Sequence, residues 1–156
     1  METSDKGIEL VKRFEGYEEK AYRCSAGVLT IGYGHTGGVY EGQACTREQA
    51  ERWLREDLRS AENAVNALEP ARPLRQCEFD ALVSFVYNLG QGNFRDSTLR
   101  RKVLANPDNP TIRDEFGRWV YADGQRLPGL VARREAEADL YFSGHRSTVP
   151  VVGVAR

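Results

Sequence analysis

The chain has 156 residues and a mass of 17.6 kDa, the size of one domain, which excludes a large multidomain machine or a long repeat array. Apolar residues make up 40% and charged residues 29%, a mixture that can bury a core and is not typical of disordered chains. The formal net charge of −1 does not favour binding to nucleic acid or to a membrane surface.

The start of the chain and its cysteines narrow the class further. Residues 1–6 are polar, and the longest apolar runs fall far short of the ~20 residues that a membrane span needs, so we expect no secretory signal or membrane anchor. Three cysteines, Cys24, Cys45 and Cys77, are an odd number at irregular spacing. They predict neither a disulfide scaffold nor a zinc site, and they indicate synthesis in a reducing cytoplasm.

The first predicted helix begins after Thr3 or Ser4, either of which can cap it. Its apolar residues recur at three-residue steps on one face, at Ile8, Val11 and Phe14. Gly16 is expected to end the helix, which places Glu15 in its last turn. A carboxylate there lies at the negative end of the helix dipole, so this position does not favour the charged form.

Residues 20–40 change character, because β-branched and aromatic residues alternate with many glycines. This pattern predicts a small, twisted antiparallel sheet with tight turns. Thr46 and Gln49 form a capping-box pattern, and a long apolar stripe then runs as far as Pro70. We expect one long helix here that links two lobes.

The sequence from about residue 70 to residue 145 predicts a helical lobe. Residues 74–89 become apolar on nearly every side, as in a central helix. Ser97 is expected to cap a short helix that reaches Leu104, and a loop then precedes another helix marked by Phe116, Trp119 and Val120. A last helix is predicted after Pro128.

These elements predict an α+β fold that is mostly helical, in a single domain over residues 1–145. We expect its lobes at about residues 16–45 and 70–145, with the N-terminal helix beside them. Residues 146–156 lack a helical period, and we expect this tail to be disordered or to lie on the surface.

Residues 15–35 combine a carboxylate at a helix end with a glycine-rich hairpin that carries hydroxyls and a thiol. On spacing alone, such a segment is more often an ordinary helix-to-hairpin junction. Its detail resembles the active-site signature of phage-type lysozymes, glycoside hydrolase family 24, which is Glu, eight residues, Asp or sometimes Cys, five residues, and Thr. This chain has Glu15, Cys24 and Thr30 at that spacing, followed by Ile31-Gly32-Tyr33-Gly34-His35.

Two further blocks, residues 79–90 and 127–135, resemble the helical lobe of the lysozymes of lambdoid phages. The resemblance covers about residues 7–143. It implies an enzyme that needs no cofactor or metal and that cleaves the β-1,4 bond between N-acetylmuramic acid and N-acetylglucosamine in peptidoglycan. It also implies a lysozyme-like fold, in which a small N-terminal β-containing lobe and a larger helical lobe hold the substrate between them.

Glu15 matches the general acid of that family. A glycosidic oxygen is a poor leaving group unless it is protonated, so this acid must hold a proton near neutral pH. The alternative is a surface glutamate in an acidic stretch, which suits its neighbours Glu18 and Glu19 better.

Cys24 stands where most relatives have aspartate, which stabilises the transition state or activates water. A thiol is mostly protonated at neutral pH unless its surroundings acidify it. Its role stays open among a base for water, a nucleophile and a polar spacer. Thr30 matches the residue that holds the attacking water, although a strand residue is the plainer interpretation. His35 is interpreted as a structural hydrogen-bonding or ion-pair residue.

The resemblance also places five residues along the saccharide cleft: Thr36, Tyr87, Asn88, Ser97 and Gly129. Aromatic faces, amides and hydroxyls are groups that sugar rings select. Core packing for Tyr87 and helix capping for Asn88 and Ser97 are equally good explanations.

The leading hypothesis is therefore a phage endolysin whose partner is the peptidoglycan glycan strand. We expect a monomer that is made in the bacterial cytoplasm and admitted to the wall at lysis by a separate holin-type pore protein. Two alternatives stay open. A lytic transglycosylase needs one glutamate but no activated water, and a wall-binding module could have lost activity through the change to Cys24.

Overall fold

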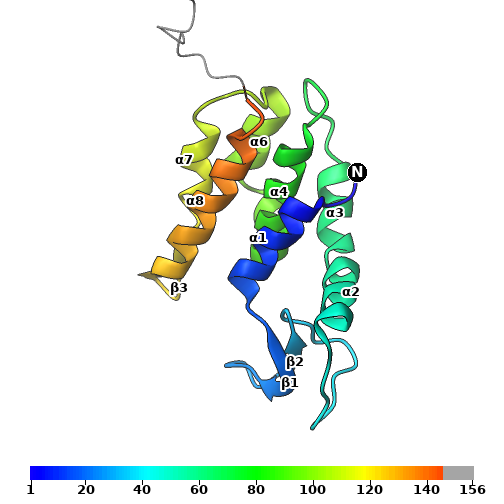
Figure 1. The fold of residues 1–156 in the computed structure, drawn as a ribbon. Coiled ribbons are helices and arrows are strands. Elements are labelled where there is room, and N and C mark those ends of the chain that lie inside the picture. The colour runs from blue at the N-terminus through cyan, green and yellow to red at the C-terminus, as the bar shows by residue number, and fades with distance from the viewer. Residues whose placement is uncertain (146–156) are drawn as a thin grey trace, which may run out of the picture.

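The computed structural model, which describes residues 1–145, has two lobes (Figure 1). Strands β1 (Glu18–Arg23) and β2 (Leu29–Gly32) form the small lobe, and helices form the large one. The other elements of the described chain are α1 (Asp5–Glu15), α2 (Arg47–Asp57), α3 (Arg59–Asn66), α4 (Gln76–Leu89), α5 (Gln91–Arg95), α6 (Thr98–Ala105), α7 (Ile112–Phe116), β3 (Tyr121–Ala122), β4 (Gln125–Arg126) and α8 (Pro128–Phe142). The predicted α+β, mostly helical fold is confirmed. The predicted tail, residues 146–156, lies outside the described residues.

Helix α1 begins after Ser4, as predicted, but the Ser4 side chain does not cap it. The Ser4 backbone N–H donates to Oδ1 of Asp80 at 3.0 Å, and the Ser4 hydroxyl donates to Oδ2 of the same carboxylate. Asp80 belongs to α4, so the start of α1 is fastened to the centre of the helical lobe. At the other end, Gly16 has a φ of 75° and ends the helix directly after Glu15.

The sheet of the small lobe is shorter than the sequence predicts. Strands β1 and β2 pair antiparallel with Tyr22 opposite Thr30, and an irregularity between Glu18 and Tyr22 shifts the register. Residues 33–45 follow as turns with isolated bridges, because closely spaced glycines interrupt the ladder. The loop after β2 therefore folds back toward the end of α1.

The predicted long connecting helix is two consecutive helices, α2 and α3, that meet at Leu58. Leu58 keeps a right-handed helical backbone, with φ −74° and ψ −15°, so the direction of the chain is nearly preserved. The Thr46–Gln49 capping box is confirmed by two reciprocal hydrogen bonds of 3.1 and 3.2 Å. The predicted apolar stripe is buried at Ala50, Leu54, Leu58, Ala61 and Val65.

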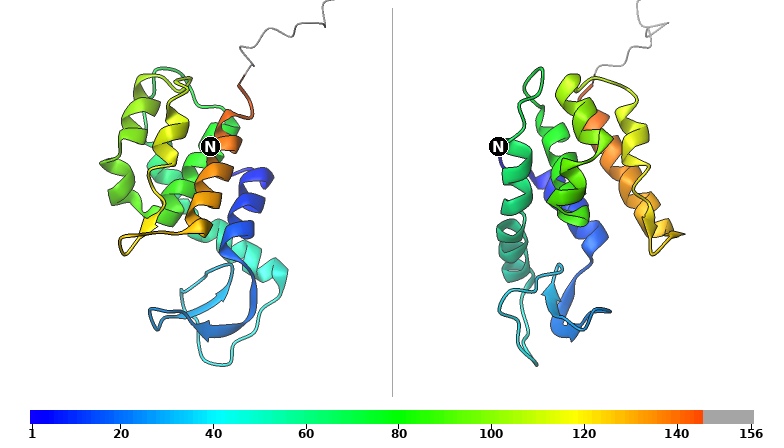
Figure 2. Two further views of the ribbon diagram at one scale, coloured as in Figure 1. Left: turned by 90° about the vertical axis from the view of Figure 1, so that its left-hand side faces the viewer. Right: turned by 180° about the vertical axis from the view of Figure 1, so that it is seen from behind.

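Helix α4 is the centre of the helical lobe, as its apolar sequence predicts. It contacts α1, α3, α5 and α8, and Figure 2 shows it surrounded by them. Residues 78–86 are all buried. Phe85 makes edge-on contacts with the rings of Phe94, Phe116 and Trp119, and burying such a ring contributes about 1.5–3 kcal/mol. The side chains that α4 presents to α1 and α8 are thus held in a rigid setting.

The helix predicted around Phe116, Trp119 and Val120 ends early, at Phe116. A short hairpin, β3 and β4, follows at residues 121–126. Asp123 and Gly124 both have positive φ values, 51° and 77°, which is the geometry that an Asp-Gly turn adopts in a two-residue hairpin. The hairpin leads directly into α8. None of the helices within residues 1–145 combines the length and the apolar character that a membrane crossing requires.

Candidate active site

Glu15 ends α1 at the point where the chain passes from the helical lobe into the small lobe. Its side chain is 21% exposed, and Oε2 accepts a hydrogen bond of 2.7 Å from Nη1 of Arg133 in α8. Arg133 is itself 4% exposed. The first and last helices of the described chain thus meet in one charged contact, which fixes the direction of a carboxylate that still reaches solvent.

Gly34 closes the other side of Glu15. Its φ is +84°, and a Cβ atom built on it would lie 3.0 Å from Oε1 of Glu15. A side chain at this position would therefore be strained and would press on the carboxylate. The glycine-rich loop after β2 brings its backbone close to Glu15. Glycine is therefore needed at position 34 for this close approach as well as for the turn.

Cys24 directly follows β1 and is half-buried in the turn toward β2. Its backbone N–H donates to the carbonyl of Val28 at 3.0 Å. Hydrogen bonding from the backbone of Val28, and then from that of Ala26, lowers the pKa of the Cys24 thiol, and the Thr30 hydroxyl adds to this effect. The turn therefore favours the thiolate, which the sequence alone could not establish.

Thr30 lies on β2 and is 5% exposed. Its hydroxyl donates to the carbonyl of Val28 at 2.9 Å, and it also lies close enough to Cys24 to affect the thiol. One hydroxyl proton can serve only one of these acceptors at a time. The structure thus joins Cys24 and Thr30 in one hairpin.

The charge of Glu15 affects the pKa values of two tyrosines, Tyr87 and Tyr22. Burial raises the pKa of Tyr87, and the charge of Glu15 raises it further, so this residue of α4 lies within electrostatic range of Glu15. Burial also raises the pKa of Tyr22 on β1, and the charges of Glu18, Cys24 and Glu15 add to it. Tyr22 is therefore within electrostatic range of both Glu15 and Cys24. Tyr22 is 42% exposed, and no sequence motif singles it out.

The other predicted cleft residues fall into two groups. Thr36, Asn88 and Gly129 are exposed, and Asn88 accepts a hydrogen bond at Oδ1 from Nη2 of Arg134. Ser97 is 2% exposed; its hydroxyl accepts from the N–H of Arg100 at 3.0 Å and donates to the carbonyl of Phe94 at 2.7 Å. Ser97 therefore caps α6, which is the alternative that its sequence position left open, and both hydrogen bonds of its hydroxyl lie within that cap.

His35 has the structural role that the sequence suggests. Nδ1 lies 2.8 Å from Oδ2 of Asp57, and the ring stacks on Trp53 with 4.7 Å between centroids. These contacts join the loop after β2 to α2. The three cysteines are free thiols.

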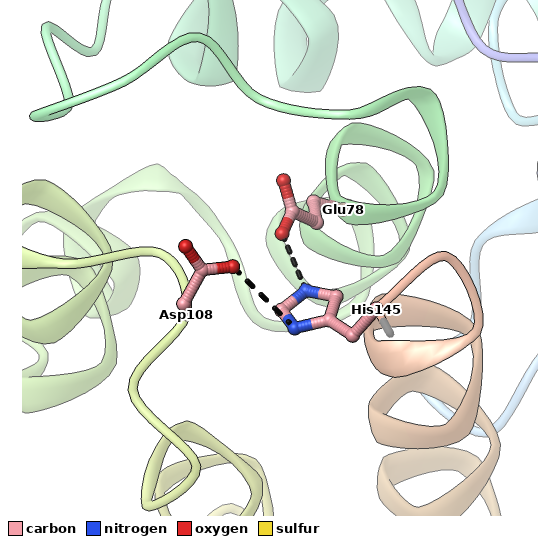
Figure 3. A group of neighbouring side chains, drawn as sticks. All are labelled: Glu78, Asp108 and His145. Carbon is pink, nitrogen blue, oxygen red and sulfur yellow. Dashed lines mark hydrogen bonds and ion pairs between the residues drawn. The ribbon is translucent and has the colours of Figure 1, made fainter. Parts of the chain in front are cut away.

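Among residues 1–145, one group of side chains has the ligand types and spacing of a metal site: Glu78, Asp108 and His145 (Figure 3). His145 lies between the two carboxylates, with Nε2 2.6 Å from Glu78 and Nδ1 3.6 Å from Asp108. Arg72 already donates to both oxygens of Glu78, at 2.9 and 2.7 Å, and to Asp108. Since arginine fills the positions that a cation would need, the cluster is better described as an ion-pair network that joins α4, the loop before α7 and the end of α8.

A hollow of about 710 Å³ lies between α1 and α2. Its walls include Arg13, Tyr17, Tyr33, Arg47 and Arg52, and none of the predicted site residues. A large hollow is not by itself an active site. The carboxylate–guanidinium contact and the glycine-rich backbone meet at Glu15 instead, and the Cys24–Thr30 hairpin belongs to the small lobe that begins directly after Glu15, so we take that junction as the site.

Two lobes with a carboxylate at their junction define a lysozyme-like protein. The sequence model described as phage lysozyme matches residues 12–137, and the chain therefore belongs to the phage lysozyme family.

Individual relatives agree with this membership. An endolysin of Acyrthosiphon pisum secondary endosymbiont phage 1 is 43% identical over 147 residues, which cover 92% of this chain and 99% of the relative. An endolysin of Bacillus phage B103 is 39% identical over 96% of this chain, which spans 57% of that longer relative. A crystal structure of a P22 lysozyme mutant superposes with a TM-score of 0.83 at 36% identity, covering 91% of this chain and 99% of the other.

Arg133 is the residue that reasoning from the sequence missed. Arginine side chains on helices usually lie on solvated faces, whereas Arg133 and Arg134 are 4% and 1% exposed. A signal was present: Glu137 follows at helical spacings of four and three residues, so both arginines can pair with it on one face.

Proposed function

We propose that this chain is an endolysin that hydrolyses the β-1,4 bond between N-acetylmuramic acid and N-acetylglucosamine in bacterial peptidoglycan. The observation that supports it best is the Glu15–Arg133 contact of 2.7 Å, at a lobe junction that is open to solvent on one side. It rests equally on membership of the phage lysozyme family and on the relatives named endolysin.

In the proposed reaction, Glu15 donates its proton to the glycosidic oxygen as the bond from that oxygen to the anomeric carbon breaks. Positive charge develops on the sugar ring, and water adds to the anomeric carbon from the opposite face. Arg133 holds the Glu15 carboxyl group in position before and after the transfer. Glu15 then recovers a proton from solvent.

We assign the activation of that water to the hairpin of Cys24 and Thr30. The thiolate of Cys24 accepts one proton of the attacking water, and Thr30 accepts a hydrogen bond from it through a free lone pair. The lowered pKa of the thiol supports a base role over that of a spacer. Water attack opposite the leaving group predicts inversion at the anomeric carbon.

Tyr87, Asn88, Thr36 and Gly129 are the proposed sugar contacts, from α4, the loop after β2 and the start of α8. We further propose that the protein is a monomer, that it is made in the host bacterial cytoplasm, and that a separate holin-type pore protein admits it to the wall. The glycan strand would then be its substrate and its binding partner.

Mass spectrometry of purified peptidoglycan after digestion tests the proposal. Hydrolysis predicts fragments with reducing N-acetylmuramic acid ends, each heavier by one water than the corresponding anhydro product. Anhydro ends would identify a lytic transglycosylase. Binding to the wall without any fragment release would identify an inactive wall-binding module.

A further inference from the structure

Glu137 of α8 is a fully buried carboxylate with 0% exposure, and no step of the proposed reaction uses it directly. Burying a charged group is costly unless other groups pair with it and satisfy its hydrogen bonds. Burial raises the pKa of Glu137, and the charges of Arg134 and Arg133 oppose that rise. A group of this kind in the helix that faces the site needs a structural explanation.

One side of Glu137 supports Arg133. Oε2 accepts a hydrogen bond of 2.5 Å from the Ser84 hydroxyl and one of 3.4 Å from Nε of Arg133. Nη2 of Arg133 donates to the backbone oxygen and the hydroxyl of Ser84, at 3.4 and 3.3 Å. Nη1 is the remaining nitrogen, and it donates to Glu15. All three nitrogens are therefore engaged, and the planar group has one orientation that satisfies them together.

The other side of Glu137 supports Arg134. Oε1 lies 3.1 Å from Nη1 of Arg134, an ion pair whose alignment falls short of a hydrogen bond. Nη2 of Arg134 donates to Oδ1 of Asn88, and the guanidinium lies over the ring of Phe85 at 5.2 Å. Arg134 therefore links Glu137 to Asn88, a second predicted site residue.

We propose that Glu137 is the positioning residue of the site: one buried carboxylate that orients Glu15 through Arg133 and Asn88 through Arg134. This inference rests on the proposed function, because it concerns how that function's acid and one of its sugar contacts are held. Ser84 completes the arrangement from α4, since its hydroxyl donates to the same Glu137 oxygen that accepts from Arg133.

A general acid that can drift by even 1 Å loses roughly 10- to 100-fold in rate, because proton transfer depends on distance and angle. Misplacing Glu15 changes the chemical step more than the binding of a long glycan, which has many other contacts. Loss of Glu137 should therefore lower kcat with little change in KM. A substitution that merely weakens folding lowers the active fraction and is distinguished by a matched control.

The test compares Glu137→Gln with Glu78→Gln in the full chain. Glu78 is equally buried and also pairs with two arginines, but it lies in the cluster of Figure 3 and reaches none of the proposed site residues. Both variants are assayed on purified peptidoglycan well below their unfolding temperatures, with folded protein quantified by circular dichroism. We expect Glu137→Gln to lose roughly 10- to 100-fold in kcat with KM within about twofold of the parent. Glu78→Gln should keep the parent kcat. Equal kcat values in the two variants would overturn the proposal.

A spectroscopic readout makes the test independent of activity. The Nε–H group of Arg133 should give a slowly exchanging ¹H–¹⁵N signal in the parent and in Glu78→Gln, and Glu137→Gln should lose it. An unchanged signal would overturn the positioning role even if the chain proved not to cleave peptidoglycan. If Glu137→Gln loses the signal but the parent does not cleave peptidoglycan, only the proposed function is refuted.

If Glu137→Gln does not fold, Ser84→Ala takes its place. This variant removes one hydrogen bond to Glu137 and should lower kcat in the same direction, and an unchanged kcat would count against the proposal.

Discussion

Arg133 and Glu15 form a 2.7 Å contact although 118 residues separate them in the sequence. The contact joins the end of α1 to α8, and both helices also contact α4. The proposed acid is therefore placed by the packing of the whole helical lobe. It follows that substitutions around Arg133 should affect chemistry more strongly than their distance from the glycan would suggest.

Two substitutions of Arg133 should show how much its charge and how much its planar shape contribute to kcat. Arg133→Met is expected to lower kcat on purified peptidoglycan roughly 10- to 100-fold, because Glu15 loses the group that orients it. Arg133→Lys keeps the charge but lacks the planar fork, so it should recover only part of that loss. Initial rates at matched folded concentrations measure both effects. Full activity in Arg133→Met would contradict the orienting role.

Substitutions of Cys24 test whether it acts as a base. Cys24→Asp should keep or increase the clearing rate, because aspartate supplies a permanent carboxylate at that position. Cys24→Ala should lower the rate strongly, and Cys24→Ser should resemble Ala because a hydroxyl is a poor base. The parent should gain activity as pH rises through the lowered pKa of Cys24, and Cys24→Asp should move this limb to lower pH. An alanine variant as active as the parent would show that Cys24 has no chemical role.

The fold should lose stability in acid through the cluster of Figure 3. Burial acts to raise the pKa of Glu78, but hydrogen bonds from Arg72, the Arg75 backbone and His145 outweigh it and hold the pKa below its usual value. Hydrogen bonds from Arg72 and Arg75 likewise hold the pKa of Asp108 well below normal. Depressed carboxyl pKa values stabilise the folded state above the unfolded values of about 4, and this contribution is lost as pH falls through the folded ones.

The free energy of unfolding, measured by denaturant titration from pH 7 to pH 2, should therefore fall below about pH 4. Glu78→Gln should be less stable at neutral pH and should show a shallower acid dependence. If the two acid profiles were parallel, Glu78 would not be a source of the pH dependence.

Ser97→Ala distinguishes a helix cap from a sugar contact. Losing the cap of α6 should cost about 1 kcal/mol, which corresponds to a fall of roughly 2–4 °C in Tm for a chain of this size. Activity per folded molecule should stay at the parent level, because the hydroxyl is buried and both its hydrogen bonds lie within the cap. A rise in KM for peptidoglycan would return Ser97 to the cleft.

Local patterns in the sequence predict most of the fold. The apolar stripes give α1, α4 and α8, and the Thr46–Gln49 box and Ser97 give the starts of α2 and α6. The predicted end of the helix around Phe116 was wrong, because a turn-forming sequence directly follows the apolar residues that favour the helix. Trp119 and Val120 look helical, yet Asp123-Gly124 forms a hairpin turn directly after them, so α7 ends at Phe116.

The candidate site was predictable as a list of residues but not as a set of contacts. Glu15, Cys24 and Thr30 stand out by their spacing and their resemblance to a family signature. The pairing of Glu15 with Arg133 depends on how α1 and α8 pack on α4, and no local pattern contains that information. The acidified thiol of Cys24 likewise depends on the backbone of one turn, which residue types alone do not specify.

The central claim is that Glu15 is the proton donor, and Glu15→Gln tests it most directly. The variant keeps the size of the side chain and an oxygen that can accept from Arg133, but it has no acidic proton to transfer. Its rate of peptidoglycan hydrolysis should fall at least about 1,000-fold while its circular dichroism spectrum and wall binding stay those of the parent. A folded Glu15→Gln variant that releases reducing ends at the parent rate would contradict the account.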